Sequence, residues 1–281
     1  PPESQVHKQV VRKRAEVRDI TLNPSTKLFY VEVTEPDMHE PSGDLERVAI
    51  ALESDWKITN IKADLHIIQS LQSTLRKGNW RVTVAIHLGN EENAPRIVHL
   101  WPGYYDGSIY GLAVDLGSTT IAAHLCDLIS GKVIASSGIM NPQIRFGEDL
   151  MSRVSYGMMN AGGAEEMTSA VREGINALFT QISNEAQINK ELIMDAVFVC
   201  NPVMHHLFLG IDPFELGQAP FALATSKSMN VKADELTLNI HPSARVYILP
   251  CIAGHVGADA AAVALSEEPD KSNDLVLIVD V

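Results

Sequence analysis

Apolar residues in the first hundred positions follow two periods, one typical of strands and one typical of helices. Short apolar runs rich in β-branched residues predict strands over 28–33, 80–88 and 96–101. Apolar positions three or four residues apart predict helices over 43–54 and 63–76. The buried face of the first helix is expected to hold Leu45, Val48, Ala49 and Leu52, and that of the second Leu65, Ile68, Leu71 and Leu75.

The pattern changes after a cluster of Pro and Gly residues at 101–107. Apolar stretches beyond it predict strands over 109–117, 118–128, 132–140, 194–200, 244–250 and 275–281, with a hairpin turn at 129–132. Helical spacing predicts helices over 147–158, 164–185, 202–210 and 257–265. Asn201 is expected to cap one of these helices, with Pro202 at its first position. Residues 211–244 are rich in Pro and polar residues and are expected to be irregular.

These elements divide the chain into three parts. Residues 1–20 are charged and predict a linker. Residues 21–105 predict a small α+β domain, in which no set of residues has catalytic spacing. Residues 106–281 predict an α/β domain, in which three successive strands are followed by helices and further strands. The chain ends within an apolar strand, so we expect it to be a fragment of a longer protein.

Composition excludes several classes of protein. Of the 281 residues, 46% are hydrophobic, which is enough for a folded core and excludes wholesale disorder. No uncharged apolar run reaches the ~18 residues of a membrane span, and we expect no signal peptide and a cytoplasmic location. The three cysteines lie far apart, which excludes a disulfide framework and favours small buried side chains.

The charge argues against nucleic acid as a partner. The net charge is −13 although the first residues are basic, so the body of the chain is strongly acidic. Nucleic-acid binding needs a basic surface. The basic start is interpreted as a solvated linker or as a contact with an acidic partner.

The segment from Ala113 to Ile121 carries the clearest candidate chemistry. An apolar strand delivers Asp115, and a turn at Gly117 leads to the hydroxyl residues Ser118, Thr119 and Thr120. Glycine lets the backbone approach a phosphate, and the turn amides and hydroxyls are suitable donors. Asp115 is placed to hold Mg²⁺ through water. The alternative is an ordinary hairpin whose aspartate caps the turn.

A second apolar strand ends in Asp280. Two such strands resemble the superfamily of acetate and sugar kinases, heat-shock chaperones and actin. The resemblance implies an actin-like, ribonuclease H-like lobe with ATP bound between it and a second lobe, and it implies that Asp280 binds nucleotide and metal as Asp115 is expected to do.

Four stretches make the resemblance more specific. They are residues 111–134, 141–156, 199–213 and 249–265, and they resemble the reductive activators of corrinoid proteins. This resemblance implies ATP-driven reduction of a corrinoid cobalt from Co(II) to Co(I), with a corrinoid protein or methyltransferase as partner. It also implies a [2Fe-2S] domain, whose plant-type cysteine spacing this sequence lacks. A homodimer is compatible with this interpretation.

Other candidate residues have competing interpretations. Asp149 is expected to face the γ-phosphate or to orient water, with Arg145 neutralising phosphate charge. The alternative is a helix N-terminus at which Glu148 and Asp149 are favoured by the helix dipole and form ion pairs with Arg153. Asn201 is a candidate ligand at the end of a strand. Gly254, Gly257 and Asp259 are expected to close on nucleotide or to give close helix packing. His205 and His206 are expected to be packed or capping side chains, with a catalytic or cobalt-facing role as the alternative. Neighbouring helical positions point about 100° apart, which argues against one metal site shared by both.

Three functions follow. The first is ATP-dependent reductive activation of a corrinoid protein by an ATPase. The second is a small-molecule kinase of the acetate and sugar kinase superfamily. The third is a scaffold that binds a corrinoid protein and uses nucleotide only as a switch.

Overall fold

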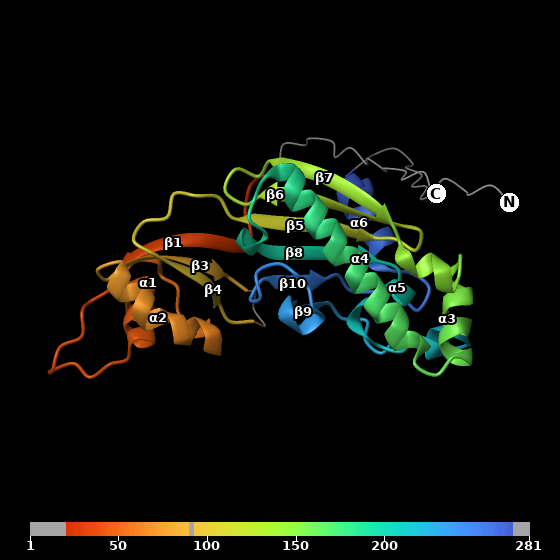
Figure 1. The fold of residues 1–281 in the computed structure, drawn as a ribbon, viewed down its shortest axis with the longest axis horizontal. Coiled ribbons are helices and arrows are strands. Elements are labelled where there is room, and N and C mark those ends of the chain that lie inside the picture. Colours follow the sequence, from red (N-terminus) through yellow and green to blue (C-terminus); the bar gives the residue numbers. More distant parts are fainter. Residues whose placement is uncertain (1–20, 90–92, 272–281) are drawn as a thin grey trace.

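A computed structural model describes residues 21–89 and 93–271 of the chain. The predicted linker 1–20 and the predicted strand 275–281, with Asp280, therefore lie outside the described residues. The described elements form two β-sheets with helices against them (Figure 1). We call them the small sheet, built from residues 26–102, and the large sheet, built from residues 110–248.

The small sheet has the strand order β1-β3-β4-β2. Its strands are β1 (Thr26–Glu32), β2 (Lys62–Ala63), β3 (Arg81–His87) and β4 (Arg96–Pro102). Two helices pack on it, α1 (Asp44–Trp56) and α2 (Leu65–Lys77). Their apolar faces and the strands bury one cluster around Val48, Leu52, Leu71, Leu75 and Val84.

The buried face of α2 differs from the prediction. Ile67, Leu71 and Leu75 are buried, whereas Leu65 is 70% exposed and Ile68 is 44% exposed. A helix turns about 100° per residue, so the residues spaced by four form a compact stripe and Leu65 lies about 120° from its centre. A spacing of three or four residues does not by itself fix which face of a helix is buried, so the prediction wrongly included Leu65 and Ile68.

The large sheet has the strand order β7-β6-β5-β8-β10-β9. Its strands are β5 (Tyr110–Leu116), β6 (Thr120–Asp127), β7 (Val133–Met140), β8 (Ile193–Cys200), β9 (Met229–Lys232) and β10 (Arg245–Ile248). β5, β6 and β7 form an antiparallel meander, and β5, β8 and β10 run parallel. The sequence pattern predicted each of these strands except β9, which lies in the segment that was expected to be irregular.

Helices cover the large sheet. They are α3 (Leu150–Met159), α4 (Gly163–Ala186), α5 (Pro202–Leu209) and α6 (Ala258–Glu267). In Figure 1, α4 crosses in front of the sheet beside α5, and α6 lies behind. Short 3₁₀ helices occur at Pro142–Phe146, Lys190–Leu192, Phe214–Gly217, Asp234–Leu236 and Pro269–Lys271. None of the helices in the described part of the chain has the length and apolar character that crossing a bilayer requires.

The two sheets pack against each other. An apolar cluster of Ala85, Val98, Ile109 and Met194 joins them, and all four side chains are fully buried. Beside this cluster the Thr26 hydroxyl donates to Asp195 Oδ2 at 3.1 Å.

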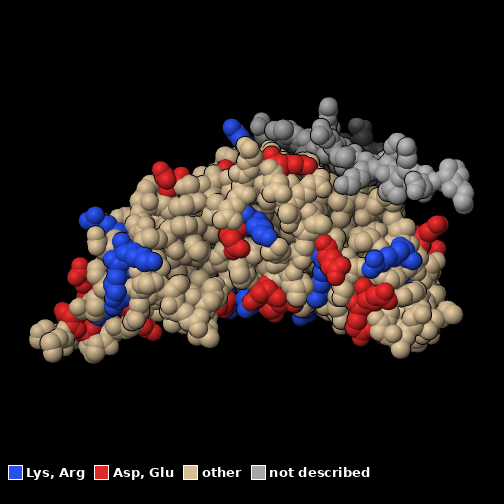
Figure 2. Space-filling model, in the orientation of Figure 1, with Lys and Arg blue, Asp and Glu red and all other residues tan. Residues whose placement is uncertain are grey.

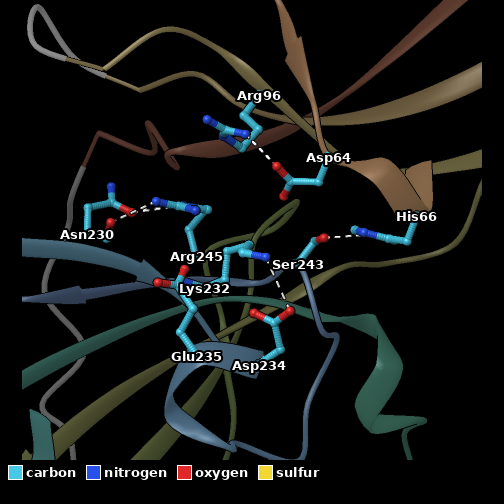
Figure 3. A network of polar contacts seen from close by, with 9 residues as sticks. All are labelled: Asp64, His66, Arg96, Asn230, Lys232, Asp234, Glu235, Ser243 and Arg245. Carbon is cyan, nitrogen blue, oxygen red and sulfur yellow. Dashed lines mark hydrogen bonds and ion pairs between the residues drawn. The ribbon is translucent and has the colours of Figure 1, made fainter. Parts of the chain in front are cut away.

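A polar network continues the contact between the sheets. His66 on α2 lies 2.7 Å from the Ser243 hydroxyl of the large sheet. Figure 3 shows side chains from the small sheet and its helices facing side chains from the large sheet around this contact. An ion pair between Arg96 and Asp64 lies on the side of the small sheet. The two sheets therefore meet through both apolar and hydrogen-bonded contacts.

Charges are dispersed over the surface. Figure 2 shows Lys and Arg interspersed with Asp and Glu on the face in view, with no continuous basic patch there.

Candidate functional site

The candidate site lies where parallel strands of the large sheet end. Leu116 and Cys200, the last residues of β5 and β8, are paired in register, and Asp115 is opposite Val199. The loops after these strands therefore meet at one edge of the sheet. In open α/β sheets, ligands bind outside the carboxyl ends of the strands.

The turn between β5 and β6 is a tight hairpin. The Gly117 amide donates to the Thr120 carbonyl at 3.1 Å. A Cβ at Gly117 would lie 2.6 Å from that carbonyl oxygen, so the turn requires glycine. The hydroxyls of Ser118, Thr119 and Thr120 make no hydrogen bond to other residues that the structure describes, and remain available as donors.

Asn141 fixes this hairpin from the protein side. Its side-chain amide donates to the Gly117 carbonyl at 2.9 Å, and its backbone amide donates to the Thr119 carbonyl at 2.8 Å. Asn141 also caps the 3₁₀ helix that begins at Pro142. We did not predict this role, although the Asn-Pro pair that marked Asn201 occurs here as well.

Arg153 lies beneath the same hairpin. Its guanidinium is fully buried and donates to the Ser118 carbonyl at 2.5 Å and to the Gly147 carbonyl at 3.1 Å. The predicted ion pair between Arg153 and Asp149 is therefore wrong, whereas the predicted place of Asp149 at the start of a helix is confirmed.

Asp149 is the N-cap of α3. Its carboxylate accepts from the Ser152 amide and the Ser152 hydroxyl, both at 2.8 Å. The Ser152 backbone bond, then the hydroxyl bond, lowers the pKa of Asp149. The side chain is exposed and lines a surface hollow of about 580 Å³ with Tyr156 and Met159. A catalytic role for Asp149 stays a prediction.

Arg145 lies in the segment just before α3. Its guanidinium lies over the Phe146 ring, 4.7 Å from the ring centroid.

The loop after β8 and the start of α6 bring three further predicted residues together. Asn201 caps α5 as predicted, and its Oδ1 accepts from the Met204 amide at 2.9 Å. A Cβ at Gly257 would collide with the Cys200 carbonyl and lie 2.5 Å from Asn201 Cα. Asp259 lies in the first turn of α6, and its Oδ1 would be 2.7 Å from the same Cβ.

Cys200 is the buried last residue of β8. Burial raises the pKa of its thiol strongly, and the charges of Cys251, Asp259 and Asp115 raise it further. Asp259 lies close to Gly257 beside the end of β8, and Asp115 precedes Leu116, which pairs with Cys200, so both residues belong to this edge of the sheet.

Gly254 has a different environment. A Cβ there would collide with the Phe221 carbonyl, so this glycine allows two loops to pack closely. The contact favours the packing interpretation for Gly254.

The paired histidines are packed side chains. His205 and His206 are buried, and burial lowers both pKa values, that of His205 to about 4. The His206 Nδ1 donates to the Pro202 carbonyl at 2.9 Å, while its Nε2 accepts from the Ala224 amide at 3.0 Å. No group of three or more His, Cys, Asp or Glu residues in the described ranges is arranged to hold a metal ion.

Comparisons with known proteins agree with one another. A family model described as the RACo middle region matches residues 110–272, and one described as the RACo linker region matches residues 15–107. The "Corrinoid activation enzyme RamQ" of Eubacterium limosum is 34% identical over 169 residues, which is 60% of this chain and 28% of that protein.

A solved structure is similar over nearly the whole chain. It is a "Reductive activator for corrinoid,iron-sulfur protein", with a TM-score of 0.83 and 31% identity over 95% of this chain and 42% of that one. The match confirms the predicted fold class, an actin-like α/β lobe preceded by a small α+β unit. The chain spans less than half the length of either relative.

Proposed function

The chain belongs to the RACo family of reductive activators of corrinoid proteins, and from this membership we propose that it is the nucleotide-binding part of an ATP-dependent activator. In this proposal the whole protein reduces a corrinoid cobalt from Co(II) to Co(I) and so supports methyl transfer. Residues 1–20 serve as a linker, 21–105 as the small domain, and 106–281 as the first lobe with the start of a second.

The hairpin after β5 supports the ATP part of the proposal. Its carbonyls are held inward by Asn141 and Arg153, and three hydroxyls remain to donate to phosphate oxygens. Mg²⁺ in such sites keeps much of its water and needs only one or two carboxylates beside the phosphates. In this proposal Asp115 holds the hydrated ion, with Asp259 nearby at the start of α6 and Asp280 as the corresponding residue of the second lobe.

The cysteines do not fit an iron–sulfur cluster. Cys200 and Cys251 are buried and Cys126 lies partly buried on β6, so they form no four-thiolate set. Burial raises the pKa of the Cys251 thiol to about 11, which opposes ligation by a thiolate. We therefore place the [2Fe-2S] electron carrier outside the described residues.

ATP would act through the arrangement of two lobes. Reduction to Co(I) is strongly uphill for a ferredoxin-type cluster, so binding and release of the partner must be coupled to nucleotide. A nucleotide held between lobes favours the closed arrangement only by its higher affinity for that state. The contacts between the small and large sheets would carry the small domain along with the first lobe.

The experiment uses the full-length protein with a purified corrinoid iron–sulfur protein in the Co(II) state. Under anaerobic conditions with a one-electron donor, Co(I) formation is followed by absorbance with and without MgATP. We expect Co(I) only with MgATP, and ATP hydrolysis that the corrinoid protein stimulates. Equal Co(I) formation without ATP, or phosphate transfer to a sugar or carboxylic acid, would overturn the proposal.

Asp115→Asn tests the site itself. We expect it to lower the affinity for MgATP at least about tenfold, because the carboxylate that orients hydrated Mg²⁺ is lost. Asp234→Asn is the matched control, since Asp234 is exposed and lies near the opposite end of the strands, where it pairs with Lys232. Equal loss in the two variants would mean that neither carboxylate is specific to the nucleotide.

A further inference from the structure

Arg153 is a cation enclosed by neutral groups. Its side chain is fully buried, and its donors reach the carbonyls of Ser118 and Gly147, the Gln143 amide oxygen at 3.4 Å and the Met204 sulfur at 3.3 Å. None of these acceptors carries a charge. Buried charges are normally paired with an opposite charge, because desolvation is costly.

No carboxylate in the described structure forms an ion pair with this guanidinium. The Asp149 carboxylate is exposed and bonds to Ser152 instead. Burial lowers the pKa of Arg153 more than the Asp149 charge raises it. The Arg153 guanidinium therefore has only neutral groups as hydrogen-bond partners among the described residues.

The guanidinium lies behind the predicted phosphate turn. Arg153 Nη2 contacts the carbonyl of Ser118, whose hydroxyl belongs to the donor set of the hairpin. The same guanidinium holds Gly147, two residues before the N-cap of α3. One side chain thus ties the hairpin to the start of α3.

We propose that Arg153 is a positioning residue whose counter-ion is the phosphate chain of the nucleotide bound on the outer side of the hairpin. The proposal rests on the ATP-binding function above and adds how this site selects its ligand. Arg153 holds the Ser118 carbonyl inward and supplies positive potential to the turn. Its effect on binding should therefore grow with the number of phosphates.

The test measures the affinity of the full-length protein for ATP, ADP and adenosine, with Arg153→Gln and Arg153→Lys. Glutamine keeps an N–H donor without charge, whereas lysine keeps the charge. We expect Arg153→Gln to weaken ATP binding ~10-fold or more, ADP binding less, and adenosine binding hardly at all. Arg153→Lys should retain the preference for ATP over adenosine within about threefold.

Arg172→Gln is the matched control. Arg172 on α4 is also partly buried, donates to a carbonyl, that of Phe208 at 3.0 Å, and has its pKa lowered by burial. Because its partner is the end of α5 rather than the hairpin, we expect Arg172→Gln to leave the ATP-to-adenosine ratio unchanged.

The outcomes separate this inference from the proposed function. If the unaltered protein does not bind MgATP, the proposed function fails. If it does, and Arg153→Gln weakens ATP and adenosine equally, Arg153 is only structural and the inference is wrong. If Arg153→Gln does not fold, Arg153→Lys decides the question: a folded Arg153→Lys protein that loses the preference for ATP over adenosine overturns the inference, and one that keeps the preference supports it.

Discussion

Three histidines meet at the contact between the two sheets. Ser243 donates its backbone amide to His241 Nδ1 at 3.1 Å, so the proton of His241 is on Nε2. That nitrogen lies 3.0 Å from His99 Nδ1, which must accept. Both rings are therefore neutral in this arrangement, with His66 close by on α2.

These histidines predict a loss of stability in acid. Burial, followed by the charges of His99 and His66, lowers the pKa of His241 to about 4, below its unfolded value of about 6.5. The unfolded chain therefore binds the proton first as the pH falls. The free energy of unfolding should decrease between about pH 6.5 and pH 4, with His241 accounting for up to about 3 kcal/mol.

The measurement is denaturant unfolding at a series of pH values. His241→Gln should flatten the slope in this window even though it weakens the fold at pH 7. His39→Gln, at an exposed position, should leave the slope unchanged. An unaltered slope in His241→Gln would contradict the assignment.

Single residues of the site were predictable to different degrees. Asp115 and the hairpin from Gly117 to Thr120 follow from a local pattern, a strand, a glycine turn and hydroxyls in succession. Arg153 contacts Ser118 across 35 positions of the chain. Nothing within five residues of Arg153 indicates that contact, and its neighbours instead suggested an ion pair on the helix surface.

Two glycines occupy different environments. One lies where two elements pack closely, and the other lies inside a helix with room for a Cβ. Gly257 precedes α6 where a Cβ would collide with the end of β8. Gly157 lies inside α3, where a Cβ would make an ordinary contact of 3.5 Å with Met167.

We expect Gly257→Ala to lower the free energy of unfolding by about 1–3 kcal/mol, because the backbone of β8 must move. Gly157→Ala should raise it by about 0.5–1 kcal/mol, because alanine is the better helix former. Chemical denaturation checks both. A neutral Gly257→Ala would show that α6 does not pack on β8 as described.

Elements differ in how strongly their own residues specify them. β5, β6 and β7 are long apolar strands joined by short turns, and their pattern was sufficient to predict them. β9 has four residues, of which Met229 and Val231 are only partly buried, and it exists by pairing with β10. A segment of four residues is too short for a hydrophobic period to be recognised, so only the pairing with β10 identifies residues 229–232 as a strand.

The whole molecule depends on the apolar contact between its sheets. Met194 on β8 is fully buried among Ala85, Val98 and Ile109. We expect Met194→Ala to lower the free energy of unfolding by about 2–4 kcal/mol, through lost burial and the cavity left behind. The unfolding transition should also become less cooperative as the sheets separate.

Calorimetry is the suitable measurement, with Met159→Ala as the control. Met159 is 84% exposed at the end of α3, so its truncation should change stability by less than about 0.5 kcal/mol. Equal effects of the two substitutions would mean that the sheets do not stabilise each other through Met194.

The sequence alone determined most element positions of the two sheets, the tight hairpin at Gly117 and the family resemblance, because each depends on neighbouring residues and their periodicity. The tertiary structure decided which face of α2 is buried, that β9 forms, and that Arg153 and Asn141 hold the hairpin from within. It also decided the contact of Thr26 with Asp195, which are 169 positions apart. Such contacts depend on which distant segments meet when apolar surfaces are buried, and local patterns do not encode that choice.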